Sequence, residues 1–224
     1  MKIKKHIIIP LFVVAFVVVV SVGITILRPG PINAQQPPLN QIEFAMVGDS
    51  ILAGRSAGIS QHSLTGILGV LRPNWFIKNF SFGGGSLAGV WTAINPANQI
   101  LANADVKKIV LILGTNDWRI GIASSTFETK YRTFLQVAGG YHPIICVTPL
   151  WRSQEGSPNS IGMTLENYRQ IIRAECVAKN FPVIEGTVLI PANSQYFLDG
   201  IHPNVLGYQA MAQNLAPLLD PHLQ

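Results

Sequence analysis

The segment Ile42-Glu-Phe-Ala-Met-Val-Gly-Asp-Ser50 decides the fold class. Its first six residues form a short, mostly apolar run of the kind expected of a β-strand, and the Gly-Asp-Ser that follows is a polar loop. Four further runs of this kind are found at 75–80, 108–113, 143–147 and 181–188. Segments with helical spacing of apolar residues are found at about 60–71, 86–102, 125–138, 162–179 and 204–217. This alternation predicts an α/β domain with five parallel strands and helices on both faces of the sheet.

Polar residues gather directly after the predicted strands. Three such clusters are Gly48-Asp-Ser50, Gly83-Gly-Gly-Ser86 and Gly114-Thr-Asn-Asp117, and a fourth, Asp199-Gly-Ile-His202, precedes the last helix. Open α/β sheets bind ligands outside the carboxyl ends of their strands. We therefore expect residues far apart in the sequence to meet above one edge of the sheet.

One of these clusters contains a serine, and another contains what a nucleophilic serine needs. A serine hydroxyl is a weak nucleophile at neutral pH and requires a base, usually a histidine held by a carboxylate. Asp199 and His202 are three residues apart, and Gly200 between them gives the backbone freedom for a tight turn. None of the other four histidines has a carboxylate at a useful spacing. The sequence therefore predicts that Ser50, His202 and Asp199 act together.

Acyl transfer also needs hydrogen-bond donors for the oxyanion that develops during the reaction. A glycine lets its backbone N–H approach a substrate closely, so the loop at 83–85 is suited to this role. The side-chain amide of Asn116 is a second donor, and the N–H of Ser50 is a third.

Taken together, these residues resemble a known family. The segments Phe44–Ser50, Asn79–Gly84, Gly114–Asp117 and Asp199–Asn204 are similar to the four ordered sequence blocks of the SGNH/GDSL hydrolases, over residues 42–217. The resemblance implies a three-layer α/β/α sandwich of flavodoxin-like type and a serine esterase or acylhydrolase that needs no cofactor and no metal.

The resemblance also assigns roles. It implies a catalytic triad of Ser50, Asp199 and His202 and an oxyanion hole formed by Ser50, Gly84 and Asn116. Gly84 is chosen over its glycine neighbours because it stands five residues after Asn79, as in the family pattern. The remaining acidic residues of the blocks, Asp49 and Asp117, are expected to support the loops through hydrogen bonds.

Three other functions compete with ester hydrolysis. A metallophosphoesterase would draw on Asp49, Asn116, Asp117, Asp199 and His202, but one histidine is few for a two-metal site. Nucleotide binding by the glycine loop is disfavoured because neither phosphate-binding glycine pattern is present. A module that binds acylated glycans or peptides without cleaving them would leave Ser50 unactivated.

Substrate identity stays open at this level. Trp118 and Arg152 are candidate substrate-binding residues, as are the adjoining Arg119 and Trp151, and ordinary loop packing explains them equally well. An arginine facing the cleft would favour anionic substrates. Short-chain and carbohydrate esters are favoured slightly over lipid esters, because no long insertion is available as a lid over an acyl chain.

The N-terminus predicts membrane association or export. Ile7–Leu27 is uncharged and apolar, and a helix of that length spans a bilayer, with lysines on its N-terminal side to keep that end in the cytoplasm. A transmembrane signal anchor and a cleaved signal peptide both fit, the latter giving a secreted or periplasmic enzyme. The expected organisation is a basic start at 1–5, the apolar helix at 6–28, a Pro-rich linker at 29–39 and the hydrolase domain at 40–224.

Charge and cysteine content exclude further classes. The net charge of +5 comes largely from the N-terminal segment, and from residue 35 onward 12 Lys and Arg face 11 Asp and Glu, so nucleic-acid binding is not expected. Cys146 and Cys176 lack the spacing of a zinc site. We expect two buried free thiols, with a single disulfide as the alternative outside the cytoplasm.

Overall fold

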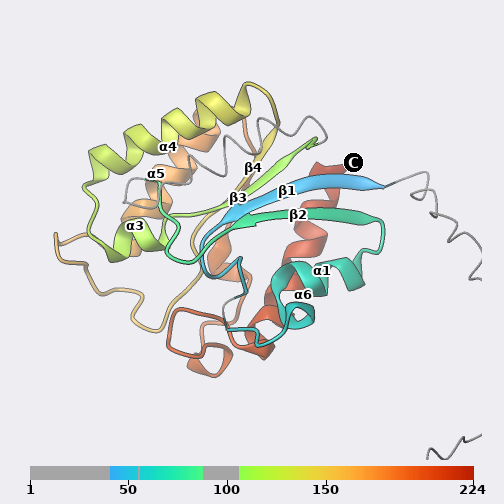
Figure 1. Cartoon of the computed structure of the whole chain (residues 1–224). Coiled ribbons are helices and arrows are strands. Elements are labelled where there is room, and N and C mark those ends of the chain that lie inside the picture. The colour runs from blue at the N-terminus through green and yellow to red at the C-terminus, as the bar shows by residue number, and fades with distance from the viewer. Residues whose placement is uncertain (1–40, 55, 88–105) are drawn as a thin grey trace, which may run out of the picture. The chain divides into compact units, whose positions relative to one another are not determined.

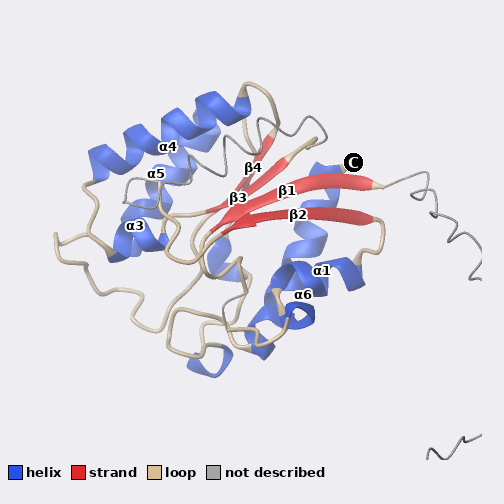
Figure 2. Cartoon of the chain, viewed as in Figure 1, coloured by secondary structure: helices blue, strands red, loops and turns tan. Residues whose placement is uncertain are grey.

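The computed structural model describes residues 41–54, 56–87 and 106–224. In this part of the chain the five predicted strands form one sheet: β1 (Ile42–Gly48), β2 (Trp75–Ser81), β3 (Ile109–Ile112), β4 (Ile144–Val147) and β5 (Val183–Ile184). The strand order is β2-β1-β3-β4-β5, and every pair is parallel. Figure 2 shows β2, β1, β3 and β4 side by side in this order. The predicted parallel five-stranded sheet is confirmed.

Helices cover both faces of this sheet (Figure 1). One face carries α1 (Leu64–Leu71) and α6 (Val205–Leu223), and the other carries α4 (Ser124–Gly139) and α5 (Leu165–Ala178). Shorter elements are α3 (Thr115–Arg119) and three 3-10 turns, η1 (Ser60–His62), η2 (Gly186–Val188) and η3 (Ser194–Tyr196).

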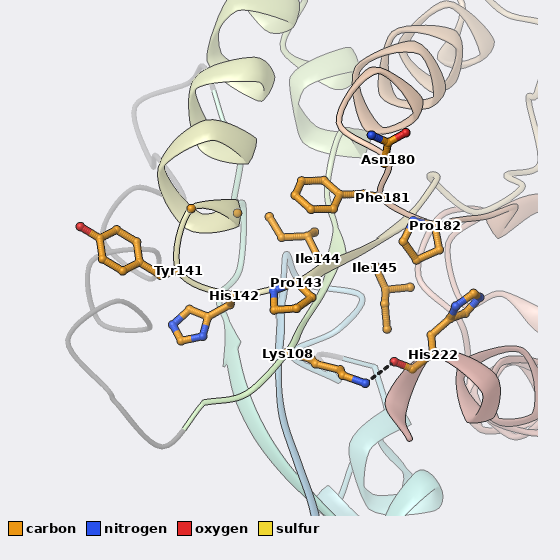
Figure 3. Close-up of a pocket in the computed structure, with 12 residues that line it drawn as sticks. Lys108, Tyr141, His142, Pro143, Ile144, Ile145, Asn180, Phe181, Pro182 and His222 are labelled. Atoms are coloured by element: carbon orange, nitrogen blue, oxygen red, sulfur yellow. Dashed lines mark hydrogen bonds between the residues drawn. The ribbon is translucent and has the colours of Figure 1, made fainter.

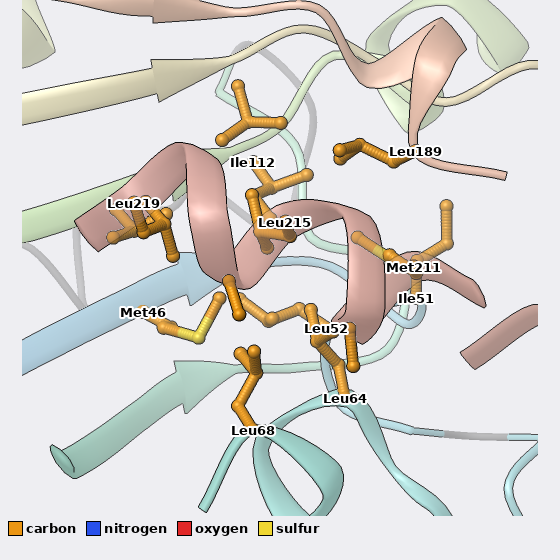
Figure 4. Packing of buried hydrophobic residues seen from close by; sticks show 14 of the residues in the cluster. Met46, Ile51, Leu52, Leu64, Leu68, Ile112, Leu189, Met211, Leu215 and Leu219 are labelled. Atoms are coloured by element: carbon orange, nitrogen blue, oxygen red, sulfur yellow. The ribbon is translucent and has the colours of Figure 1, made fainter. Parts of the chain in front are cut away.

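The residues of β1 explain why the sheet is covered on both sides. Successive side chains of a strand point to opposite faces. Phe44 and Met46 pack with the residues of α1 and α6, whereas Ala45 and Val47 pack with those of α4 and α5, and all four are fully buried. Figure 4 shows the first of these two cores, in which Met46 lies among leucines of α1 and α6. A strand with two buried faces has to be apolar at nearly every position, as this one is.

The strand order also fixes where a ligand can bind. The chain leaves β1 for β2 on one side, whereas β3 lies on the other side of β1. Doubly wound sheets bind their ligands at the carboxyl ends of the strands where the order reverses in this way, here the ends of β1 and β3. Ser50 and Asn116 follow these two strands.

Two of the predicted elements are wrong in extent. The fifth strand was expected at 181–188, but β5 has only two residues. The chain leaves the sheet because Gly186 begins the turn η2, where its N–H donates to the hydroxyl of Thr148 at 2.8 Å. The first helix was expected over 60–71, but Ser63 interrupts it and caps α1, with its hydroxyl accepting from the N–H of Gly66.

The other helices differ mainly in their ends. The last helix continues beyond the predicted residue 217 to Leu223 despite two internal prolines, and Leu219 and Leu223 are buried along the extension. The short helix α3 was not predicted at all. The helix expected at 86–102 lies almost wholly outside the described residues.

The expectation of two free thiols is wrong. Cys146 of β4 and Cys176 of α5 form a disulfide with both residues fully buried. The two residues are 30 apart in sequence but face each other across the contact between sheet and helix, with the Cα atoms 6.6 Å apart. That contact is tertiary, so the sequence spacing did not reveal it.

The segments predicted at 1–5, 6–28 and 29–39 lie outside the described residues. Within the described ranges, none of the helices combines the length and apolarity that crossing a membrane requires.

Candidate active site

The loop after β1 carries Ser50 at the carboxyl end of the strand. The strand ends at Gly48, where a larger side chain would collide with Leu52 and the carbonyl oxygen of Ile112. The chain then turns sharply, and the N–H of Ala53 donates to the carbonyl of Asp49 at 2.9 Å. Ser50 is 5% exposed. Most of the residue is therefore enclosed by protein.

A second tight turn carries Asp199 and His202. The carboxylate of Asp199 accepts hydrogen bonds from the N–H groups of Ile201 at 3.1 Å and His202 at 2.8 Å. The turn requires Gly200, whose φ of 83° lies in the left-handed region. The N–H of Ser153, which follows β4, donates to the carbonyl of Gly200 at 2.9 Å and fastens the turn to the rest of the domain.

These two loops form a continuous hydrogen-bonded chain of three side chains. The Oγ of Ser50 lies 2.8 Å from Nε2 of His202, and Nδ1 of His202 lies 2.7 Å from Oδ2 of Asp199. A carboxylate only accepts, so Nδ1 carries the proton and Nε2 is free to accept from the serine hydroxyl. The three residues that the sequence singled out for serine chemistry are thus brought together.

The charge of Asp199 is well supported. Its partial burial would raise its pKa, but hydrogen bonds from the backbone and ring of His202 and from Ile201 outweigh this and lower the pKa to about 2. The carboxylate is therefore ionised at neutral pH and can hold the imidazole in one tautomer.

The glycine loop leaves the backbone N–H groups of Gly83 and Gly84 without a hydrogen bond to any described residue. Gly84 has a φ of 77°, and the N–H of its neighbour Gly85 is used within the loop, donating to the carbonyl of Phe82 at 3.1 Å. In the part of the chain that the structure describes, no hydrogen bond from the N–H of Gly84 is found. Of Gly84 and Gly85, Gly84 is the one with a donor available for a substrate.

Asn116 joins the serine loop to the glycine loop. Its Nδ2 donates to Oδ2 of Asp49 at 3.3 Å and to the carbonyl of Gly85 at 3.1 Å, and its Oδ1 accepts from Nε of Arg119 at 3.2 Å. The amide is therefore held in one orientation. Both of its N–H groups have acceptors within the protein.

The two remaining block carboxylates are buried and hold loops. Asp49 accepts from the N–H of Ile51 at 2.9 Å as well as from Asn116, and Asp117 accepts from the N–H of Leu87 at 3.2 Å. Burial raises the pKa of Asp49 to about 6, although the Ile51 hydrogen bond and the nearby His202 act in the opposite direction. These contacts are of the supporting kind expected from the sequence.

Trp118 and Arg152 come from different loops and pack on each other. The guanidinium carbon of Arg152 lies 3.9 Å from the centre of the Trp118 ring, and the two residues are only 4% and 7% exposed, respectively. Trp151 instead packs against Phe197, with the ring centres 5.4 Å apart. Arg119 is exposed and lies beside Asn116.

Tyr208 also contributes to the geometry but was not singled out from the sequence. Its hydroxyl donates to the carbonyl of Ile51 at 2.8 Å and so ties α6 to the serine loop. Its position on the buried face of a helix marks it only as a core residue. Ser153 was missed for a similar reason, since its contribution is a backbone hydrogen bond.

A separate hollow of about 500 Å³ lies at the opposite edge of the sheet (Figure 3). It is lined by residues near the starts of β3, β4 and β5, among them Lys108, His142 and Phe181. The ammonium group of Lys108 is bonded to main-chain oxygens of His222 and Gln224. The strands are parallel, so this hollow is remote from their carboxyl ends and from Ser50.

Comparison with known proteins points to one family. The model of the GDSL-like lipase/acylhydrolase family matches residues 46–210, a range that includes Ser50, Gly84, Asn116, Asp199 and His202. No curated protein sequence matches the chain.

Solved structures of similar fold are numerous but distant in sequence. A member of the lipolytic protein G-D-S-L family from Veillonella parvula DSM 2008 is 20% identical, with a TM-score of 0.68 over 80% of this chain and 98% of that one. A lipase/acylhydrolase from Enterococcus faecalis is 17% identical, with a TM-score of 0.66 over 81% and 97%. TesA is 19% identical, with a TM-score of 0.68 over 80% and 98%. These likenesses show a shared fold.

Proposed function

The chain belongs to the GDSL-like lipase/acylhydrolase family and is therefore an ester-hydrolysing enzyme, and we propose that it works as a serine esterase with Ser50 as its nucleophile. The observation that carries this proposal is the hydrogen-bonded chain from Ser50 through His202 to Asp199, with links of 2.8 and 2.7 Å. Such a chain activates a serine that would otherwise be unreactive.

In the first half of the reaction, Oγ of Ser50 attacks the ester carbonyl carbon while its proton passes to Nε2 of His202. The tetrahedral intermediate then collapses, and the alcohol leaves with that proton. In the second half, water attacks the acyl-enzyme, again losing a proton to His202, and the acid is released as Ser50 recovers its hydrogen. Asp199 stabilises the imidazolium that forms at each step without accepting its proton.

The oxyanion of each tetrahedral intermediate needs hydrogen-bond donors close to Oγ of Ser50. We assign this role to the N–H groups of Ser50 and Gly84 and to the amide of Asn116. The Asn116 amide must share one of its N–H groups, or release it from Asp49 or Gly85, when the oxyanion forms. That exchange is local, because both acceptors lie within 3.3 Å of Nδ2.

A metal-dependent phosphoesterase is less well supported by the same geometry. Both ring nitrogens of His202 are engaged, one by Ser50 and one by Asp199. A metal ligand would need one of these nitrogens.

The natural substrates are proposed to be short-chain, carbohydrate or lipid esters, with the first two favoured. This preference rests on the sequence, in which no long insertion is available as a lid over an acyl chain.

The domain is proposed to act on the exported side of a membrane, either anchored by the apolar segment 6–28 or released after signal cleavage. The charge pattern of the N-terminus supports this orientation. The disulfide between Cys146 and Cys176 supports it independently, because disulfides persist mainly in oxidising compartments.

A panel of p-nitrophenyl esters from acetate to palmitate, with acetylated sugars and a lysophospholipid, tests this proposal. Wild type should hydrolyse part of the panel in the presence of a chelator, and Ser50→Ala should not. Ser125→Ala, which changes an exposed serine of α4, is the matched control and should retain activity. A fluorophosphonate probe should label wild type and leave Ser50→Ala unlabelled. Full activity in Ser50→Ala would overturn the proposal.

A further inference from the structure

Arg152 is a buried cation with too few partners. The residue is 4% exposed, and its Nη2 donates to the carbonyl of Ser157 at 3.3 Å. Its Nε is shielded from solvent and has no hydrogen-bond partner. A guanidinium has five N–H donors. Four of them thus make no hydrogen bond to any described residue.

The carboxylate that could neutralise Arg152 is already engaged elsewhere. Glu155 is three residues away, but both of its oxygens accept from the guanidinium of Arg169, and one also accepts from the backbone N–H of Arg152. Among the described residues, no carboxylate forms an ion pair with the Arg152 side chain. Buried charges are normally paired. Stacking on Trp118 compensates only part of the desolvation.

The position of this guanidinium connects it to the proposed site. The next residue, Ser153, is hydrogen-bonded to Gly200 of the turn that carries Asp199 and His202. On its other side Arg152 stacks on Trp118, which lies two residues beyond Asn116 in α3. Arg152 is therefore attached both to the histidine turn and to the helix that carries the proposed oxyanion donor.

We propose that Arg152 forms an anion-binding subsite and that the enzyme prefers esters carrying a carboxylate near the scissile bond; this inference rests on the proposed function. The Arg152 guanidinium has N–H donors without acceptors, and the two oxygens of a carboxylate can accept from two of these donors at once. Arginine and carboxylate groups commonly pair in this bidentate way. Arg119, exposed beside Asn116, adds a second positive charge at the same end of the sheet. Trp118 holds the guanidinium flat and limits its movement.

Two pairs of substrates test this subsite from the two sides of the ester. On the alcohol side the pair is 4-acetoxybenzoate and 4-acetoxybenzamide, and on the acyl side it is the p-nitrophenyl monoester of adipic acid and its terminal carboxamide. Within each pair only the charge changes. We expect at least one pair to show a kcat/KM about tenfold or more higher for the carboxylate in wild type, at constant ionic strength.

The variant Arg152→Met should abolish this preference mainly through KM, because methionine can still cover Trp118 but cannot bind a carboxylate. Its thermal stability should be equal to or above that of wild type, since an unpaired buried charge is removed. Arg132→Met is the control, because this cation lies on α4 and is paired with Glu128 and Glu175. It should keep the preference.

A binding measurement makes the test independent of turnover. Adipate at millimolar concentration should raise the melting temperature of wild type, and adipamide should not. Equal kcat/KM within both substrate pairs, or a preference that survives in Arg152→Met, would overturn the subsite while leaving ester hydrolysis intact. Absence of any ester turnover, with the adipate effect present, would instead count against the proposed function. If Arg152→Met does not fold, the wild-type comparisons alone decide.

Discussion

Asp49 should make the stability of this protein depend on pH in an unusual direction. It is a buried carboxyl whose pKa is raised by burial to about 6, against an ordinary value of 3.8. The folded state therefore binds more protons than the unfolded state between these two values, and the free energy of unfolding should fall as pH rises from about 4 to 6. The difference between the two pKa values corresponds to about 3 kcal/mol. Most carboxylates in hydrogen bonds have the opposite effect.

The perturbation is Asp49→Asn, and the assay is urea unfolding of both proteins at pH 4.5, 5.5 and 7. In wild type the Asp49 contribution is lost by pH 7, whereas the variant has no proton to lose at this position. The difference in unfolding free energy between the two proteins should therefore shift by about 2 kcal/mol in favour of the variant as pH rises across this range. Comparing differences removes the contributions of other titrating groups.

A control with the opposite sign is Asp220→Asn. The hydrogen bond with Arg72 lowers the pKa of Asp220, so this half-buried carboxylate contributes stability above its unfolded pKa, and the variant should lose that stability there. An Asp49→Asn difference that is flat with pH would refute the argument that burial dominates at Asp49. Activity of Asp49→Asn should also fall, because Asn116 and Ile51 donate to different oxygens of Asp49, and an amide replaces one of these oxygens by an NH2 donor.

Four further predictions follow from single contacts. Asp199→Asn should lower kcat by about 10⁴-fold with the fold intact, because the imidazole loses the partner that fixes its tautomer; an unchanged kcat in steady-state ester assays would contradict that role. Asn116→Ala should lower kcat by about 10²- to 10³-fold with little change in KM, measured on p-nitrophenyl acetate. Replacing both Cys146 and Cys176 by Ala opens a loop of 30 residues and should cost about 3 to 4 kcal/mol in urea unfolding, and wild type with reductant should behave alike. Gly200→Ala forces a side chain into a left-handed turn against Ser153 and should lower activity more than stability, which circular dichroism melting and ester assays separate.

The fold was predictable from the sequence because strand burial leaves a local signature. The run from Phe44 to Val47 packs against helices on both faces of the sheet, so none of its side chains is exposed to solvent. For this reason no polar residue interrupts it. The length of the short strand β5 could not be predicted in this way. The chain leaves the sheet for the 3-10 turn η2, in which Gly186 packs against Thr148 and Val188 is exposed, and the residue types alone do not distinguish this turn from a strand.

Contacts between elements were harder to predict from the sequence than the elements themselves. The sequence correctly predicted that Cys146 and Cys176 are buried. Their disulfide bond, however, depends on how α5 packs on β4. The helix α3 has only five residues, too few for an apolar period to appear, although it carries Asn116 and Trp118.

The sequence by itself determined which residue types follow which strands, and so it identified Ser50, Asn116, Asp199 and His202 as candidates before any contact was known. Only the tertiary structure decided how they meet. Ser50 and His202 are 152 residues apart and come within 2.8 Å because two turns are fixed by packing and by backbone hydrogen bonds. The stacking of Arg152 on Trp118 and the sharing of Asn116 between Asp49 and Gly85 have the same origin. Local patterns record burial and turns, whereas distances between loops depend on the whole sheet and the helices that cover it.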